Sequence, residues 1–444
     1  MKFRKFGKAL LMTAISAGVV FGISSCVQSY TVGYLYVTGT QTASTTGAGI
    51  ISGFKIDHNT GNLVSISGLP ISSGGANPVR AVLLTGGRFV YVLNRGTTTD
   101  GGPCSATDVC SNANITQFSI GGNGVLSPQG TYYTQGNNPI RMVADSSGTH
   151  IMVLDHDAPN GTGCSLVFGP SVTTCGDITA FSVDSTTGRL SYVLNSQVTA
   201  ASGSPLPYFP VPANPIDFTL SSSFFLTLSG TPASGDSVFP YAYNVANGQL
   251  TVNQNSSQPL GISYGNAIVV AGGVTYVLDN GPNTNTPSSN GQIFAFTLGS
   301  NGALQAEANG YYADLAPYSN PNYVITTSNG KWLYVLNEGD NSNTNNSQSG
   351  IAAFIITNPY QLSPIAGQGA VNSTPGSGAG PQCILEDPSN QFIYTANFNS
   401  STVTGLTIDQ NAGVLVPLSQ STKAKDSYAL PGPATWCVAS GRTS

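Results

Sequence analysis

Short apolar runs separated by polar turn residues recur along the whole chain. The clearest run is residues 331–337, with the sequence KWLYVLN, which follows the Asn329-Gly330 turn. A run of this length, rich in aromatic and β-branched residues, is typical of a buried strand and is too short for a helix. No segment gathers apolar residues at a period of 3.6, so we predict a protein without long helices.

The same strand type occurs seven times. The copies start at Tyr36, Tyr91, Met152, Leu226, Tyr276, Tyr334 and Tyr394. The spacings between them are 55, 61, 74, 50, 58 and 60 residues. These intervals are longer than a single hairpin needs, and they suit a four-stranded repeat with loops of variable length.

Two further landmarks repeat in phase with these strands. A tight turn with glycine follows six copies, at Gly61, Gly124, Gly188, Gly248, Gly302 and Gly413, and only the sixth copy lacks it. A proline opens a segment before most copies, at Pro78, Pro139, Pro215, Pro321, Pro381 and Pro433, while Tyr264 holds that place in the fifth. Each repeat therefore has four strands: A after the proline, B the apolar run, C an aromatic strand, and D after the glycine turn.

The two ends of the chain indicate how the repeats close. The chain enters at a B strand near Tyr34, and it ends with an A strand, residues 433–440, that has no B strand after it. We therefore predict that the last strand completes the first repeat. The fold class is all-β, a seven-bladed β-propeller of four-stranded blades with the A strands around a central channel.

The first 25 residues form a separate segment. Four basic residues, Lys2, Arg4, Lys5 and Lys8, precede an apolar run over residues 9–23, which is the pattern of an export signal and is shorter than a membrane span. The sequence ISSC that ends at Cys26 resembles the lipobox of bacterial lipoproteins, in which this cysteine is lipidated. An ordinary export signal with a chance cysteine is the alternative.

These patterns predict three parts of the chain. Residues 1–25 are the signal peptide, 26–33 a short tether, and 34–444 a single propeller domain. We expect a periplasmic or outer-membrane-anchored lipoprotein that is monomeric and meets the membrane through its lipid alone. Without residues 1–25 the chain keeps 10 basic and 19 acidic residues, a formal charge of −9, so it has too few cations to bind nucleic acid.

Six cysteines remain besides Cys26. The predicted disulfides are Cys104–Cys110, Cys164–Cys175 and Cys383–Cys437. The first two are local pairs in loops rich in small residues, and the third joins two A strands and locks the ring. A zinc site is the alternative for the local pairs, but no histidine lies near enough in sequence to complete a familiar ligand spacing, so we expect no metal and no cofactor.

The repeated motifs resemble those of a known family. The Tyr-Val-x-Asn strand, the Asn-Pro start and the Thr-Gly-x-Leu hairpin are similar to those of the lactonase family of seven-bladed propellers, which includes the propeller 6-phosphogluconolactonases. The resemblance covers nearly all of residues 34–440 and implies a hydrolase that acts on a sugar lactone. The family's Pro-Arg-His motif reads Pro321-Asn322-Tyr323 here, so Arg and His are both replaced, whereas Asn337-Glu338 matches the family's Asn-Glu.

One ring of positions carries the candidate binding residues. Counting two residues past each proline gives Arg80, Arg141, Asp217, Asn266, Tyr323, Cys383 and Thr435. The next position is apolar in every blade and includes Trp436. Because only 7% of the residues are charged, two arginines and an aspartate in one ring indicate a channel that binds a small anion. The alternative is that both arginines pair with Asp217 and bind nothing.

Lactone hydrolysis needs a base to activate water and a cation or amide donors to hold the developing oxyanion. Glu338 is the candidate base and Arg141 its electrostatic partner, with their proximity inferred from blade geometry. A solvated loop carboxylate is the alternative for Glu338. None of the three histidines falls on an A strand, with His58 in a hairpin, His150 at the start of a B strand and His156 in the loop after it. The G-x-S-x-G match at 261–265 is not a nucleophile elbow, because a strand follows it and every histidine precedes it.

Two classes of function follow from this pattern. The first is a hydrolase of the lactonase type that opens a small anionic sugar lactone at the channel mouth. The second is a nonenzymatic propeller of the cell envelope that binds protein or glycan partners through its loops.

Overall fold

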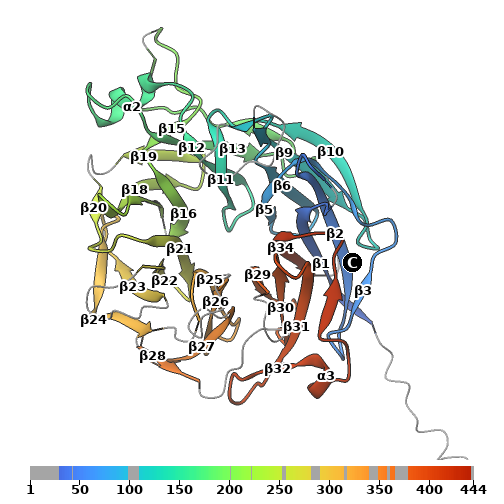
Figure 1. The fold of residues 1–444 in the computed structure, drawn as a ribbon. Helices are drawn as coiled ribbons and strands as arrows, with labels where there is room; N and C mark the ends of the chain where they lie inside the picture. Colours follow the sequence, from blue (N-terminus) through green and yellow to red (C-terminus); the bar gives the residue numbers. More distant parts are fainter. Residues whose placement is uncertain are drawn as a thin grey trace, which may run out of the picture.

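The predicted seven-bladed β-propeller is confirmed. In the computed structural model, seven antiparallel sheets stand in a ring around a central axis (Figure 1). The residues that the structure describes are 30–42, 44–98, 110–200, 202–221, 223–252, 257–281, 291–314, 318–339, 349–357, 361–365 and 379–441. Cys26 and Cys104 lie outside these ranges, as does the predicted signal segment.

Each blade has four strands in the order A to D, and four blades add a fifth strand beside strand C. Blade 1 comprises β34 (Ala434–Gly441), β1 (Thr31–Thr40), β2 (Ala48–Asp57), β3 (Leu63–Ser65) and β4 (Ile71–Ala76). Blade 2 comprises β5 (Pro78–Leu83), β6 (Phe89–Asn94), β9 (Asn114–Ile120) and β10 (Leu126–Tyr132). Blade 3 comprises β11 (Asn137–Ala144), β12 (His150–Asp157), β13 (Gly176–Val183), β14 (Leu190–Tyr192) and β15 (Phe209–Val211).

The other half of the ring repeats this order. Blade 4 comprises β16 (Pro215–Ser221), β17 (Phe224–Thr231), β18 (Gly235–Asn244), β19 (Gln249–Val252) and β20 (Gln258–Pro259). Blade 5 comprises β21 (Gly265–Ala271), β22 (Val274–Asp279), β23 (Gln292–Leu298) and β24 (Leu304–Asp314). Blade 6 comprises β25 (Pro321–Thr326), β26 (Trp332–Asn337), β27 (Gly350–Thr357) and β28 (Gln361–Pro364). Blade 7 comprises β29 (Pro381–Glu386), β30 (Phe392–Asn397), β31 (Thr402–Ile408), β32 (Leu415–Pro417) and β33 (Ser427–Ala429).

The B strands are the most deeply buried elements. β6, β22, β26 and β30 are buried at every position. A strand covered by a neighbouring blade on both faces buries all of its side chains, which is why the repeated run is continuously apolar and does not alternate. The A strands β5, β11, β16, β21, β25, β29 and β34 lie innermost, around the axis (Figure 1).

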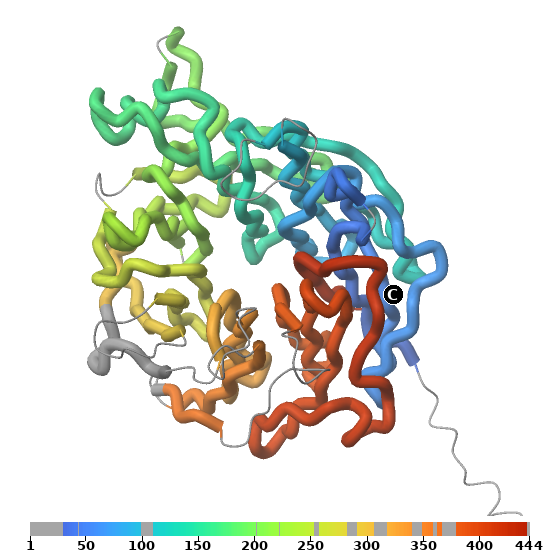
Figure 2. Tube along the Cα trace, viewed as in Figure 1, coloured from blue at the N-terminus to red at the C-terminus, as the bar shows by residue number. Residues whose placement is uncertain are grey.

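The ring closes as predicted. Strand β34 at the C-terminal end pairs antiparallel with β1, with Val37 opposite Cys437. The two ends of the described chain therefore lie side by side in Figure 2. The predicted Cys383–Cys437 disulfide is present and joins β29 of blade 7 to β34 of blade 1. Closure thus rests on both strand pairing and a covalent bond.

Two of the repeated sequence landmarks meet across the blade boundaries. The hydroxyl of the B-strand tyrosine donates to the carbonyl of a turn glycine in the next blade in four cases: Tyr36 to Gly124, Tyr91 to Gly188, Tyr334 to Gly413 and Tyr394 to Gly61. All six turn glycines have φ between 67° and 82°. A side chain at such a φ is strained, and glycine also leaves the carbonyl open to the tyrosine.

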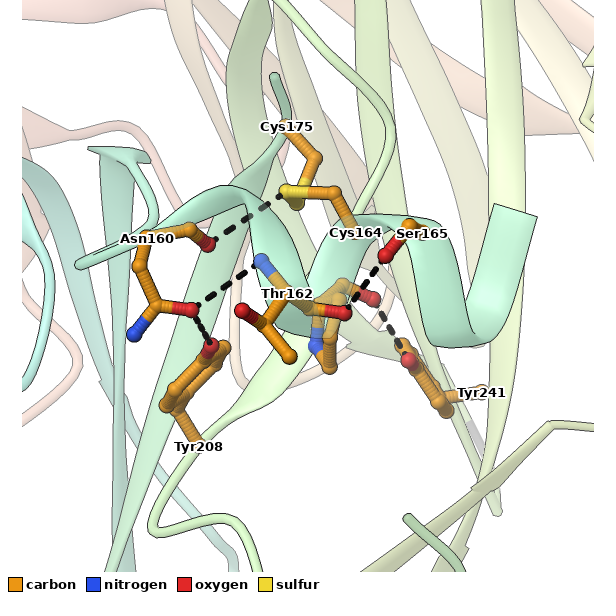
Figure 3. The surroundings of a disulfide bond; sticks show 8 residues. Asn160, Thr162, Cys164, Ser165, Cys175, Tyr208 and Tyr241 are labelled. Carbon is orange, nitrogen blue, oxygen red and sulfur yellow. Dashed lines mark hydrogen bonds between the residues drawn. A yellow bond between two sulfur atoms is a disulfide. The ribbon is translucent and has the colours of Figure 1, made fainter. Parts of the chain in front are cut away.

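The second predicted disulfide that the structure describes, Cys164–Cys175, stabilises the long connection between β12 and β13 of blade 3 (Figure 3). It carries helix α2 (Gly161–Phe168), whose first turn is capped by the Asn160 side chain accepting from the Thr162 N–H at 3.1 Å. Outside the blades, the remaining elements are α3 (Leu418–Ser421) and the short strands β7 (Thr97–Thr98) and β8 (Cys110–Ser111). Within the described ranges, no helix has the length and apolar character needed to cross a membrane.

Candidate functional site

A cavity of about 530 Å³ lies on the propeller axis. The A strands line it from Arg80, Arg141 and Tyr323 at one level to their last residues, such as Leu83 and Glu386, at the other. Between these ends the walls are apolar. A concave site with a few polar groups at defined levels of an apolar wall is the usual form of a small-molecule site.

The register of each A strand against its B strand decides which side chains belong to the ring of candidate binding residues. In each blade a bulge lies near the start of strand A, as between Pro78 and Arg80, so that Arg80 lies opposite Leu93. The same geometry brings Arg141, Asp217, Tyr323 and Cys383 to the ring, as predicted.

The predicted ring positions in blades 5 and 1 are wrong by one residue. In blade 5 Gly265 takes the place of the proline, so Ala267 occupies the ring. Asn266 is exposed, and its side chain donates to the Pro321 carbonyl at 3.0 Å and not to the cavity. In blade 1 Ala434 takes the place of the proline, so the ring residue is Trp436, not Thr435.

Arg141 and Asp217 form a buried ion pair. The guanidinium donates through Nε and Nη2 to the two carboxylate oxygens, and both residues are at most 5% exposed. The carboxylate also accepts the backbone N–H groups of Phe218 at 2.9 Å and Ile268 at 3.0 Å. Burial raises the pKa of the Asp217 carboxyl, and the Arg141 charge opposes that shift. The positive charge of Arg141 is therefore compensated within the protein.

Arg80 has no such compensation. Its Cζ lies 3.3 Å from the centre of the Trp436 ring and 5.9 Å from that of Tyr323. The two rings meet edge to face, with their centres 4.9 Å apart. Nε and Nη1 of Arg80 are buried without a hydrogen-bond partner, and Arg80 forms no ion pair with any residue of the described ranges.

This aromatic pair gives the Arg80 charge only partial stabilisation. A cation over an aromatic face gains roughly 0.5–2 kcal/mol, less than an ionised partner supplies. The ring of candidate binding residues therefore carries a net positive charge. An anionic ligand is the natural complement of that charge.

The structure does not bring the predicted catalytic pair together. Glu338 follows β26, and the nearby Gln382 side chain partly opposes the effect of burial on the pKa of its carboxyl. Burial raises the pKa of the Glu338 carboxyl, which makes a purely solvated loop residue the wrong description. Glu338 does not line the cavity, however, and among the described residues Arg141 pairs with Asp217 instead.

One carboxylate that the sequence interpretation missed does line the cavity. Glu386 ends strand β29, three residues beyond the ring position of Cys383. Its Oε2 accepts from Ser328 N at 2.7 Å and Ser328 Oγ at 2.6 Å, and burial raises its pKa. No sequence motif marked this residue.

The histidines lie away from the axis. His58 is in the turn after β2, whereas His150 and His156 both belong to β12, so the expectation that His156 follows that strand is wrong. Asp155 of the same strand is fully buried, and burial raises its pKa. In the part of the chain that the structure covers, no three side chains of His, Cys, Asp or Glu are arranged to hold a metal ion.

Comparison with known proteins finds one family model and several solved structures that this chain resembles. Residues 283–434 match the model of a family described as lactonase, 7-bladed beta-propeller. Among solved structures, the periplasmic gluconolactonase of Pseudomonas aeruginosa is similar with a TM-score of 0.62 at 17% identity, over 93% of this chain and 99% of that one. A candidate 6-phosphogluconolactonase of Bacteroides fragilis gives 0.61 at 15% identity, over 92% and 98%.

These likenesses establish the architecture. At such low identities a structural match supports the fold and not the activity. No sequence match to a curated protein was found. The chemistry of the cavity therefore has to be argued from its own side chains.

Proposed function

We propose that the protein hydrolyses a small anionic sugar lactone bound in the axial cavity. The observation that carries the proposal is Arg80, a half-buried cation that rests on Trp436 and Tyr323. Its Nε and Nη1 have no hydrogen-bond partner, and it lacks a carboxylate partner in the described structure. A phosphate or carboxylate on the substrate would complete this site. The partial family match and the two lactonase-like neighbours support the reaction class.

The proposed reaction is addition of water to the lactone carbonyl. A carboxylate takes one proton from water while the oxygen of that water bonds to the carbonyl carbon. The ring C–O bond then breaks, and the leaving oxygen is protonated to give the hydroxy acid. Two residues are candidates for the base: Glu386, which lines the cavity, and Glu338, which matches the family pattern and lies outside the cavity lining. For both carboxyls burial raises the pKa, which brings a general base closer to neutral pH.

The test compares three variants on a panel of phosphorylated and unphosphorylated sugar lactones, corrected for spontaneous opening. We expect Glu386→Gln or Glu338→Gln to lower kcat by about 100-fold or more, and only one of them to do so. Arg80→Met should raise KM for the anionic lactones. Arg141→Ala is a poorer test of chemistry, because it leaves Asp217 buried and unpaired. No turnover above background by the wild type on any lactone would end the proposal.

A nonenzymatic binding protein is the second candidate. The observation that favours it is the Arg141–Asp217 pair, in which two of the charged ring residues already bind each other. Calorimetry with a non-hydrolysable aldonate separates the two. Binding that depends on Arg80, without turnover of any lactone, would support a binding role.

We further propose that the protein is an exported lipoprotein, monomeric and anchored through Cys26. The basic and apolar pattern of residues 1–25 and the lipobox-like sequence before Cys26 support this. The disulfides Cys164–Cys175 and Cys383–Cys437 fit an oxidising compartment. Cys26→Ala should move the protein from the membrane to the soluble fraction after cell lysis, and an unchanged membrane fraction would refute the anchor.

A further inference from the structure

A second pocket, of about 240 Å³, opens between blades 4 and 5. It lies at the starts of strands β18 and β21 and shares no lining residue with the axial cavity. Three kinds of side chain meet there: the carboxyl of Asp236, the aromatic ring of Tyr264, and the amides of Asn266 and Asn280. None of these residues takes part in the proposed lactone reaction.

Asp236 has unused hydrogen-bonding capacity in this pocket. The residue is 3% exposed, and its Oδ2 accepts the backbone N–H of Gly265 at 2.6 Å. Its Oδ1 is buried without a partner. Gly230 also lines the pocket, and a Cβ added there would lie 2.3 Å from Oδ1, so this oxygen packs directly against the Gly230 backbone at the pocket wall. An unsatisfied buried acceptor costs about 1–3 kcal/mol, which a donor on a ligand would recover.

Tyr264 supplies an aromatic surface at the same pocket. Its side chain is 45% exposed, although its ring packs closely on the backbone of Gly281. A Cβ on Gly281 would lie 2.1 Å from the Tyr264 Cδ2 atom, so only glycine leaves room for the ring there. The Tyr264 carbonyl is also held by the Asn280 N–H at 2.9 Å. A ring supported in this way loses little freedom when a ligand stacks on it.

The amides are fixed by the neighbouring blade. Asn266 Nδ2 donates to the Pro321 carbonyl at 3.0 Å, and Asn280 Oδ1 accepts from Asn320 N at 3.1 Å. Each amide therefore keeps one polar end for other partners, Oδ1 of Asn266 as an acceptor and Nδ2 of Asn280 as a donor. Groups of both kinds around an aromatic ring match a ligand with hydroxyls on its edge and C–H groups on its face.

We propose that this pocket is a second binding site and that it takes a neutral sugar ring. A ligand hydroxyl donates to Asp236, the C–H face of the sugar stacks on Tyr264, and the amides of Asn266 and Asn280 bind further hydroxyls. Burial raises the pKa of the Asp236 carboxyl, and nearby Asp279 adds to the shift. The site is independent of the proposed hydrolysis.

The test is isothermal titration calorimetry, in which the full-length protein is titrated with each member of a panel of neutral mono- and oligosaccharides. We expect saturable binding of at least one saccharide below about 10 mM. Tyr264→Ala should weaken it roughly tenfold or more, as should Asp236→Asn. Tyr133→Ala, which removes a tyrosine that is 58% exposed and lines neither pocket, is the matched control and should leave binding unchanged.

Several results would overturn the proposal. These are no saccharide binding, binding that survives Tyr264→Ala, or tighter binding of putrescine than of any sugar. Tyr264 is exposed, so this variant keeps the test valid if Asp236→Asn does not fold. Arg80→Met should leave saccharide binding intact, which separates this site from the axial cavity. A loss of binding in that variant would also count against a second site.

Discussion

Removing the Cys383–Cys437 disulfide is expected to destabilise the propeller at its seam, which is the place where β34 pairs with β1 and closes the ring. The bond spans 54 residues and joins the A strands of blades 7 and 1, beside the pairing of β34 with β1. The loop-entropy relation assigns about 4 kcal/mol to a crosslink of this span. For a propeller of this size that loss lowers Tm by roughly 5 °C. Thermal unfolding of the double variant Cys383→Ala/Cys437→Ala, followed by circular dichroism, measures it.

The local disulfide provides the matched control. Cys164–Cys175 spans 11 residues, for which the same relation gives about 3 kcal/mol at most. Its two cysteines are as deeply buried as those of the Cys383–Cys437 bond, so the loss of packing on truncation to alanine is similar in both double variants. Because this bond closes only the connection between β12 and β13 that carries α2, part of the stability it supplies is confined to that segment. A Tm unchanged by the seam variant, or lowered more by the control, would refute the reasoning.

Three further perturbations have defined outcomes. Burial raises the pKa of Asp145 but hydrogen bonds from its neighbours lower it to about 2, so its stabilisation is present above pH 4 and is lost as pH falls toward 2. Between these pH values the free energy of unfolding, measured by urea titration, should fall by about 1–2 kcal/mol in the wild type and by less in Asp145→Asn. Arg141→Met should cost about 3–5 kcal/mol in urea unfolding, and adding Asp217→Leu should restore most of it, whereas equal losses would contradict the buried pair. Tyr334→Phe removes the 2.8 Å bond to the Gly413 carbonyl and should cost about 1 kcal/mol by the same assay, and no loss would contradict its role between blades.

The fold could be predicted because its signals are local and repeated. The B-strand run, the turn glycine and the opening proline each act within a few residues, and seven approximate copies average out the exceptions. The ring closure followed from the ends of the chain alone. Where the structure describes both cysteines, the disulfide predictions Cys164–Cys175 and Cys383–Cys437 are confirmed.

The site could be predicted only in part, because it depends on register between strands. Proline spacing located Arg80 in the ring. The same rule failed where Ala434 replaces the proline, so Trp436 was assigned to the apolar level although it forms the aromatic face under Arg80. The contact of Arg80 with Trp436 joins opposite ends of the chain. The separation of Glu338 from the cavity lining likewise depends on blade geometry that no local pattern encodes.

The central claim is that an uncompensated Arg80 on the aromatic pair selects an anionic lactone. The most direct measurement is kcat/KM for 6-phosphogluconolactone relative to gluconolactone, in the wild type and in Arg80→Met. The account predicts a preference of about ten- to a hundredfold for the phosphorylated lactone in the wild type, lost in the variant. Equal values for both lactones in the wild type, or a preference that survives Arg80→Met, would contradict it.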